Sequence, residues 1–193
     1  MPQKMNVAVI VGSLRKESVS RRAALALAKL APDQLNLQIV EIGDLPHYDE
    51  DLEAAGAPQS WTHFREELGA ADAVLFVTPE YNRSVPGALK NAIDVGSRPY
   101  GSSAWSGKPA AIMSLSPGAL GGFGANHHLR QSLVFLDMPI LQQPEAYVGG
   151  AFSLFDERGE FASEETKKFF QAFINSFARW ITVNTVVEVE PVS

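Results

Sequence analysis

The residues best suited to chemistry are three serines and an arginine in one short segment near the N-terminus. Ser13, Ser18 and Ser20 are interleaved with Arg15 within residues 12–20. Hydroxyl groups can donate hydrogen bonds to phosphate oxygens, and a guanidinium adds a charge-assisted contact. The segment therefore predicts a site for a phosphate monoester. The alternative is an ordinary turn in which Ser20 is the N-cap of a helix and Arg15 is solvated.

A strand and a helix hold this segment on either side. Residues 7–11, Val-Ala-Val-Ile-Val, form an apolar run typical of a strand that is buried on both faces. A helix is expected over residues 20–31, which are rich in alanine and leucine, and Pro32 ends it. Where a strand leads through a short loop into a helix, unpaired backbone N–H groups and the positive end of the helix dipole point to one place. This geometry supports the phosphate interpretation.

The rest of the chain repeats the alternation of strand and helix. Further strands are expected at residues 37–42, 73–77, 109–115 and 138–141, and further helices at 58–71, 86–96, 125–136 and from Ser163 onward. Such alternation indicates an α/β fold in which helices cover both faces of a parallel sheet. A phosphate loop after the first of five strands favours a flavodoxin-like three-layer sandwich with strand order 2-1-3-4-5. We expect residues 1–193 to form this single domain, with its ligand beyond the carboxyl ends of the strands.

Two more loops are expected at the same edge of the sheet. Residues 78–86 and 116–124 are rich in small residues and glycine, so their backbone groups can approach a flat heterocycle. Neither a P-loop nor a dinucleotide fingerprint is present, since Gly12 stands alone and the glycines of 118–124 lack the required spacing. A monophosphate site with room for a planar ring describes FMN. The alternatives for these two loops are a plain turn and a flexible glycine loop.

The composition limits the functions open to the chain. Its 193 residues carry a formal net charge of −6, which argues against non-specific nucleic-acid binding. There is no cysteine, so cysteine redox chemistry and metal–thiolate sites are excluded, and no metal is expected. A redox role would therefore depend on a bound organic cofactor. No apolar run reaches the length of a membrane span and no secretory segment is evident, so we expect a cytoplasmic protein without membrane insertion.

Several segments resemble the NADPH-dependent FMN reductase family, most closely its bacterial chromate and quinone reductase branch. The resemblance is carried by Gly-Ser-Leu-Arg-Lys-x-Ser at 12–18, by Thr-Pro-Glu-Tyr-Asn-Arg-Ser-Val-Pro-Gly-Ala-Leu-Lys-Asn-Ala-Ile-Asp at 78–94 and by the segments 116–122 and 128–137, within about residues 5–150. It implies that the first segment binds the FMN phosphate, the second wraps the flavin ring largely through its backbone, and the third approaches the pyrimidine side. The residues that the resemblance assigns to the cofactor are Ser13, Arg15, Ser18, Val19, Ser20, Pro79, Glu80, Tyr81, Asn82, Arg83, Ser116 and Gly118.

The resemblance also implies a function, that of an oxidoreductase. A hydride would pass from NADPH or NADH to bound FMN, and the electrons would then reach a small-molecule acceptor by ping-pong turnover. Quinones, chromate, azo compounds, ferric chelates and free flavin are the acceptors that it implies, and no catalytic side chain is needed because the chemistry occurs on FMN. The alternatives are a flavodoxin-like electron carrier or FMN-binding regulatory module without steady-state turnover, and a phosphoester-binding module without flavin.

An oligomer is a further implication of the resemblance, either a homodimer or a homotetramer. The helix at 86–96 would form a dimer contact. Asn126, His127 and Glu145 are candidates for a tetramer contact.

Five side chains outside these loops have two interpretations each. His47, His127 and His128 are either proton donors or surface and interface histidines. Tyr48 and Trp105 either line a pocket for the electron acceptor or are ordinary exposed aromatic residues of loops.

Overall fold

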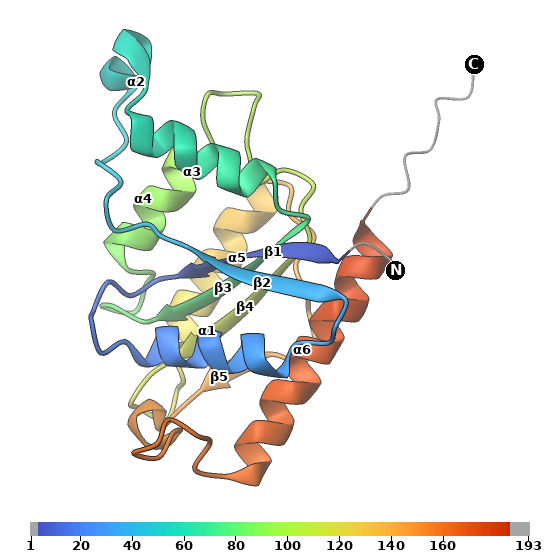
Figure 1. Cartoon of the computed structure of the whole chain (residues 1–193). Helices are drawn as coiled ribbons and strands as arrows, with labels where there is room; N and C mark the ends of the chain where they lie inside the picture. The colour runs from blue at the N-terminus through green and yellow to red at the C-terminus, as the bar shows by residue number, and fades with distance from the viewer. Residues whose placement is uncertain (1–3, 186–193) are drawn as a thin grey trace, which may run out of the picture.

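The computed structural model describes residues 4–185 and shows a five-stranded sheet (Figure 1). The strands are β1 (Met5–Val11), β2 (Leu35–Val40), β3 (Ala73–Pro79), β4 (Ala110–Leu115) and β5 (Ala146–Val148). They lie in the order β2-β1-β3-β4-β5, and every neighbouring pair is parallel. The predicted fold class and strand order are therefore confirmed.

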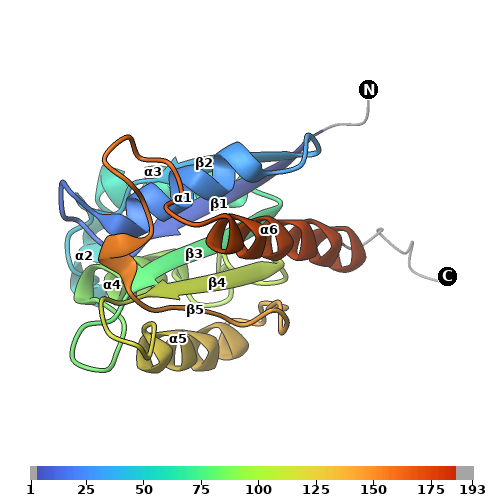
Figure 2. The same ribbon diagram turned by 90° about the horizontal axis from the view of Figure 1, so that it is seen from below.

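Helices cover both faces of the sheet. Helices α1 (Val19–Leu30) and α6 (Glu164–Asn184) lie together on one side, as Figures 1 and 2 show. The other face packs against α3 (Gln59–Gly69), α4 (Gly87–Gly96) and α5 (Phe123–Phe135). Two short helices, α2 (Glu50–Gly56) and the 3₁₀ helix η1 (Ala151–Ser153), lie in connections. Within residues 4–185, no helix combines the length and the apolar character that crossing a membrane requires.

The central strand β1 illustrates how the two cores form. Successive side chains of a strand point to opposite faces. Val7, Val9 and Val11 pack into the core under α1 and α6, whereas Ala8 and Ile10 pack into the core under α3, α4 and α5. All five are at most 4% exposed. The continuous apolar run in the sequence therefore marks a strand that is covered on both sides.

The fifth strand lies later in the chain than the sequence pattern predicted. The segment 138–141 makes only an isolated bridge, between Ala110 and Ile140. Pro139 lies within this segment and Pro144 follows it, and proline cannot donate to a ladder of hydrogen bonds. The regular ladder with β4 forms only over Ala146–Val148.

The first helix begins earlier than predicted. Its N-cap is Ser18, whose Oγ accepts a hydrogen bond from the backbone N–H of Arg21 at 3.1 Å. Ser20 therefore lies inside the first turn and is not the cap, so the alternative that treated Ser20 as an N-cap is wrong. The side chain of Ser20 is buried, with 3% exposure, and does not cap the helix.

Candidate functional site

A cavity of about 200 Å³ opens at the carboxyl ends of β1, β3 and β4. Its walls come from the loops after these strands, from the start of α1 and from η1. The lining residues are Ser13, Arg15, Ser18, Val19, Ser20, Pro79, Glu80, Tyr81, Leu115, Ser116, Pro117, Ala151 and Phe152. A larger groove of about 570 Å³ lies between α1 and the segment 158–161. Ligands of parallel sheets bind at the carboxyl ends of the strands, so the smaller cavity is the candidate cofactor site.

One end of the cofactor site is rich in hydrogen-bond donors. The amides of Val19 and Ser20 lie in the first turn of α1, where a helix offers no acceptors for its own N–H groups. The side chains of Ser13, Ser18 and Ser20 are buried beside them, at 9%, 3% and 3% exposure. Arg15 lines the same end and brings a positive charge. Amides, hydroxyls and a guanidinium at a helix N-terminus form a donor set that fits a phosphate group.

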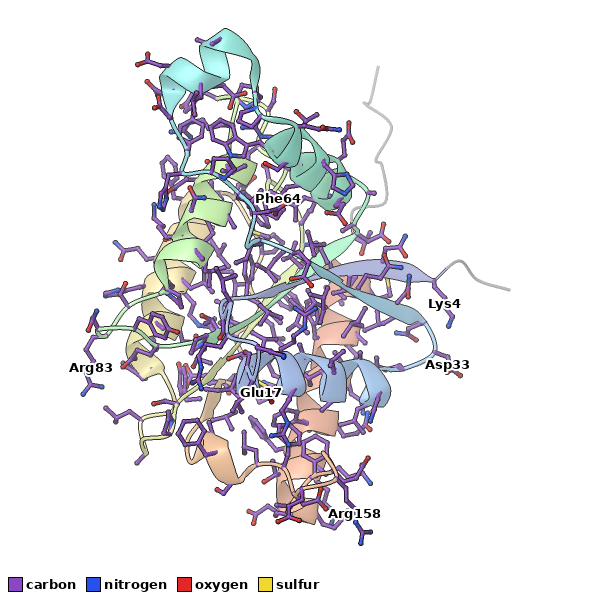
Figure 3. The ribbon with its side chains drawn as sticks, turned by 60° about the vertical axis from the view of Figure 1, so that its left-hand side comes forward. Lys4, Glu17, Asp33, Phe64, Arg83 and Arg158 are labelled. Atoms are coloured by element: carbon purple, nitrogen blue, oxygen red, sulfur yellow. The ribbon has the colours of Figure 1, made fainter. Side chains whose placement is uncertain are left out.

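The second wall is a tight turn after β3. Tyr81 and Ser84 exchange two backbone hydrogen bonds, each 2.9 Å from N to O. Between them, Asn82 and Arg83 have φ angles of +50° and +64°. Asparagine adopts this left-handed conformation readily, whereas for arginine it carries strain. The side chain of Arg83 is 73% exposed and projects from the edge of the molecule (Figure 3).

The third wall combines the loop after β4 with η1. The carbonyl oxygen of Ser116 accepts a hydrogen bond from the N–H of Ala151 at 3.1 Å. This contact brings Phe152 to the cavity, where its ring is 68% exposed. The Oγ of Ser116 accepts from the N–H of Gly118 at 3.3 Å and so shapes the turn that follows.

Nine of the twelve predicted cofactor residues line this cavity. The other three, Asn82, Arg83 and Gly118, lie in the adjoining turns and not in the lining. The residues that the sequence did not indicate are Leu115, Pro117, Ala151 and Phe152. Leu115 and Pro117 are the sequence neighbours of the predicted residue Ser116, so including the neighbours of Ser116 would have found both. Ala151 and Phe152 come from a distant, irregular segment whose only signal is the preceding pair of glycines at 149–150.

The aromatic residues considered for an acceptor pocket lie elsewhere. Trp105 is fully buried, and its indole N–H donates to the carbonyl oxygen of Ile93 at 3.0 Å. Both predicted interpretations of Trp105 are therefore wrong, because its ring belongs to the core beside Phe76. Tyr48 packs against Trp61 with ring centroids 5.4 Å apart and does not line the cofactor site.

The histidines also lie outside the cofactor site. His47 is exposed. His128 lies on α5, and its Nδ1 is 2.9 Å from the Oγ of Ser84. His127 is 2.8 Å from the hydroxyl of Tyr147, which donates to Glu145 at 2.9 Å. Burial raises the pKa of Tyr147 to about 12, and the hydrogen bond to Glu145 acts in the same direction.

One residue proposed for a subunit contact is in the interior. Asn126 is fully buried and donates to the Oγ of Ser114 at 3.3 Å. Its Oδ1 accepts from the Nε of Arg130 at 3.0 Å. The side chain of Asn126 cannot meet another subunit because it joins α5 to β4, whereas His127 and Glu145 are exposed.

Comparison with known proteins identifies the family. The profile of the NADPH-dependent FMN reductases matches residues 5–153. A quinone reductase from Pseudomonas putida is 65% identical over 187 residues, which is 97% of this chain and 100% of the relative. A 2-hydroxy-1,4-benzoquinone reductase from Burkholderia sp. is 44% identical over 177 residues, covering 92% of this chain and 96% of the relative.

A solved structure agrees with these relatives. FerB, a flavoenzyme NAD(P)H:(acceptor) oxidoreductase from Paracoccus denitrificans, superposes with a TM-score of 0.88 at 43% identity. The match covers 93% of this chain and 98% of FerB. The family profile spans well over half of the chain, including all three walls of the cofactor site. The chain therefore belongs to the NADPH-dependent FMN reductase family and is an oxidoreductase that uses FMN and a reduced nicotinamide nucleotide.

Proposed function

We propose that this protein is a quinone reductase that draws its electrons from NADPH or NADH through FMN held in the cofactor site. The observation that carries the proposal is the make-up of the site, in which a phosphate-type donor set shares one cavity with the loops that follow β3 and β4. Two relatives that match nearly the whole chain are named for quinone substrates.

The residues of the site divide into two roles. Ser13, Arg15, Ser18, Val19 and Ser20 bind the FMN phosphate with hydroxyl, guanidinium and amide donors. The walls that follow β3 and β4 hold the flavin ring between them. Pro79, Glu80, Tyr81 and Ser116 line these walls, and Asn82, Arg83 and Gly118 lie in the turns that adjoin them.

FMN, when bound, supplies the chemistry of hydride acceptance and electron release. The chain's own residues would position the ring in the cavity, and a nicotinamide or a quinone would have to reach it from the solvent side. If the nicotinamide and the quinone use this same space in turn, turnover is ping-pong. An open site of this kind also admits chromate, azo compounds, ferric chelates and free flavin, which we propose as further acceptors.

We also propose that two or four copies of the chain assemble. Exposed apolar side chains gather on α5, where Phe123, Val134 and Phe135 are 49%, 70% and 81% exposed. Large exposed apolar residues in one region mark surfaces that contact other proteins. Light scattering on the purified protein distinguishes the monomer from the dimer and the tetramer, and cell fractionation tests the predicted cytoplasmic location.

Steady-state kinetics test the main proposal. NADPH and NADH are compared as donors at fixed benzoquinone, and the acceptor panel is then compared at fixed donor. The expected result is rapid oxidation of at least one nucleotide with parallel double-reciprocal lines. An electron carrier or a regulatory module would bind FMN and fail to consume either nucleotide, which would contradict the proposal.

A further inference from the structure

Glu80 lies in the wall of the cofactor site, yet its carboxylate is bound to a helix. Its Oε2 accepts a hydrogen bond from the backbone N–H of Ala125 at 3.2 Å. Its Oε1 accepts from the Nη1 of Arg83 at 3.3 Å. The side chain is only 12% exposed, so water competes little for these contacts. The carboxylate therefore connects the turn after β3 with the first turn of α5.

The contact with Ala125 replaces a missing helix cap. The N-cap residue of α5 is Gly122, which has no side chain to accept hydrogen bonds from the first turn. Ala125 is the third residue of this helix, and its N–H is one that an N-cap side chain commonly binds. Glu80 supplies the acceptor from a position 45 residues earlier. A carboxylate at a helix N-terminus also interacts favourably with the helix dipole.

The same helix supports the turn at two further points. A Cβ at Gly124 would lie 2.6 Å from the carbonyl oxygen of Arg83, so this close approach requires glycine. One turn later, the Nδ1 of His128 is 2.9 Å from the Oγ of Ser84. Within the turn, Arg83 has a positive φ that is strained for a residue of its type, and surrounding contacts stabilise such a backbone. The start of α5 therefore acts as the support of the turn.

We propose that Glu80 is a positioning residue for the flavin. By capping α5, it fixes the backbone at Pro79 and Tyr81 in the wall of the cofactor site. This inference rests on the proposed function, in which the turn after β3 holds the flavin ring. It assigns to Glu80 the role of a hydrogen-bond acceptor for the N–H of Ala125, which the amide oxygen of glutamine can also fill.

Three variants test the proposal in the full-length protein. Glu80→Ala removes the acceptor, and Glu80→Gln keeps an amide oxygen in its place. Gly124→Ala adds a methyl group that clashes with the backbone of the turn at Arg83. Glu53→Ala is the matched control, because Glu53 also pairs with an arginine, Arg65, at 2.6 Å and is not part of the cofactor site. Hydrogen-exchange mass spectrometry of the apoprotein over residues 123–128 measures the cap directly. Fluorescence titration measures the dissociation constant for FMN.

The expected pattern separates the cap from general stability. Glu80→Ala speeds exchange of the Ala125 amide by at least about tenfold and weakens FMN binding about tenfold, as leaving the buried N–H of Ala125 without its acceptor predicts. Glu80→Gln stays within about twofold of the wild type on both measures, because its amide oxygen still accepts. Gly124→Ala weakens FMN binding as Glu80→Ala does, and Glu53→Ala changes neither measure.

Two results would overturn the proposal. One is unchanged FMN affinity in Glu80→Ala, and the other is equal loss in Glu80→Gln and Glu80→Ala. Arg15→Ala distinguishes failure of this inference from failure of the site assignment. If Arg15→Ala weakens FMN binding and Glu80→Ala does not, only the positioning role is wrong. If neither weakens it, FMN does not bind in this cavity.

Discussion

Gly12 and Thr78 lie so close together that a Cβ added at Gly12 would sit 2.3 Å from the Oγ1 of Thr78. The contact joins the ends of β1 and β3, where the N–H of Gly12 also donates to the carbonyl oxygen of Val77 at 3.0 Å. Thr78 is fully buried, so its side chain cannot move away from an added methyl group without disturbing the core. The phosphate end and the ring end of the cofactor site therefore meet at a point that excludes any side chain on Gly12.

Gly12→Ala tests this contact. The added methyl group forces the two strand ends apart, so we expect a loss of about 1–3 kcal/mol in the free energy of unfolding, together with weaker FMN binding. Urea denaturation measures the first effect and fluorescence titration the second. Gly69→Ala is the control, since a Cβ at that exposed position meets nothing within 4 Å. Equal behaviour of the two variants would contradict the predicted clash.

Arg15→Ala tests the phosphate site. Removing a charge-assisted contact should weaken FMN binding about ten- to a hundredfold, or roughly 1.5–3 kcal/mol. Lys16→Ala removes a neighbouring positive charge from a residue that does not line the cofactor site and should have a much smaller effect. The same titration at low and moderate salt checks that the contact is local, because screening diminishes long-range attraction more than a direct hydrogen bond. Unchanged FMN retention in Arg15→Ala would refute the assignment.

Phe152→Ala tests the wall that the sequence did not reveal. Loss of one aromatic contact with the cofactor should weaken FMN binding about three- to tenfold. The ring is 68% exposed, so the free energy of unfolding of the apoprotein should change by less than about 0.5 kcal/mol. Tyr100→Ala, at a loop residue that is 88% exposed and outside the site, should leave FMN affinity unchanged. A large loss of stability with normal FMN affinity would make Phe152 structural.

The raised pKa of Tyr147 predicts that the free energy of unfolding falls at alkaline pH. Burial and Glu145 raise the pKa of Tyr147 from its ordinary value of 10.0 to about 12. A raised pKa means that the folded state retains a proton that the unfolded state has already lost, so stability is full below about pH 10 and declines as the pH rises to about 12. Urea denaturation at pH 9, 10 and 11 should show a smaller decline in Tyr147→Phe than in the wild type. Tyr100→Phe should decline as the wild type does.

The first part of the cofactor site could be predicted because its residues are continuous in the sequence. The apolar run of β1 identifies a buried strand, and the serines and Arg15 follow it directly. The helix cap was misplaced by two residues, from Ser18 to Ser20, because either serine satisfies the local preference. Only the hydrogen bond from Arg21 distinguishes them.

The rest could not be predicted because it depends on contacts between distant segments. Trp105 stands in a loop of serine, glycine and proline, yet it fills the core against Gly96, where an added Cβ would lie 2.6 Å from its ring. The strand β5 has only three residues in its ladder and follows an interrupted apolar segment. Similarly, nothing local to Glu80 indicates that its carboxylate binds the amide of Ala125.

The strand order has a consequence for how the protein acquires its cofactor during synthesis. Residues of the phosphate end leave the ribosome among the first twenty, but the wall that carries Phe152 follows only after about three-quarters of the chain. Because β1 lies between β2 and β3, the nascent chain cannot complete the sheet beside the phosphate loop until β3 has been made. Domains fold as units while they are synthesised. We therefore expect FMN to bind late in synthesis, when the chain is nearly complete. The phosphate loop after β1 is made early, but it gains the walls that hold the flavin ring only then.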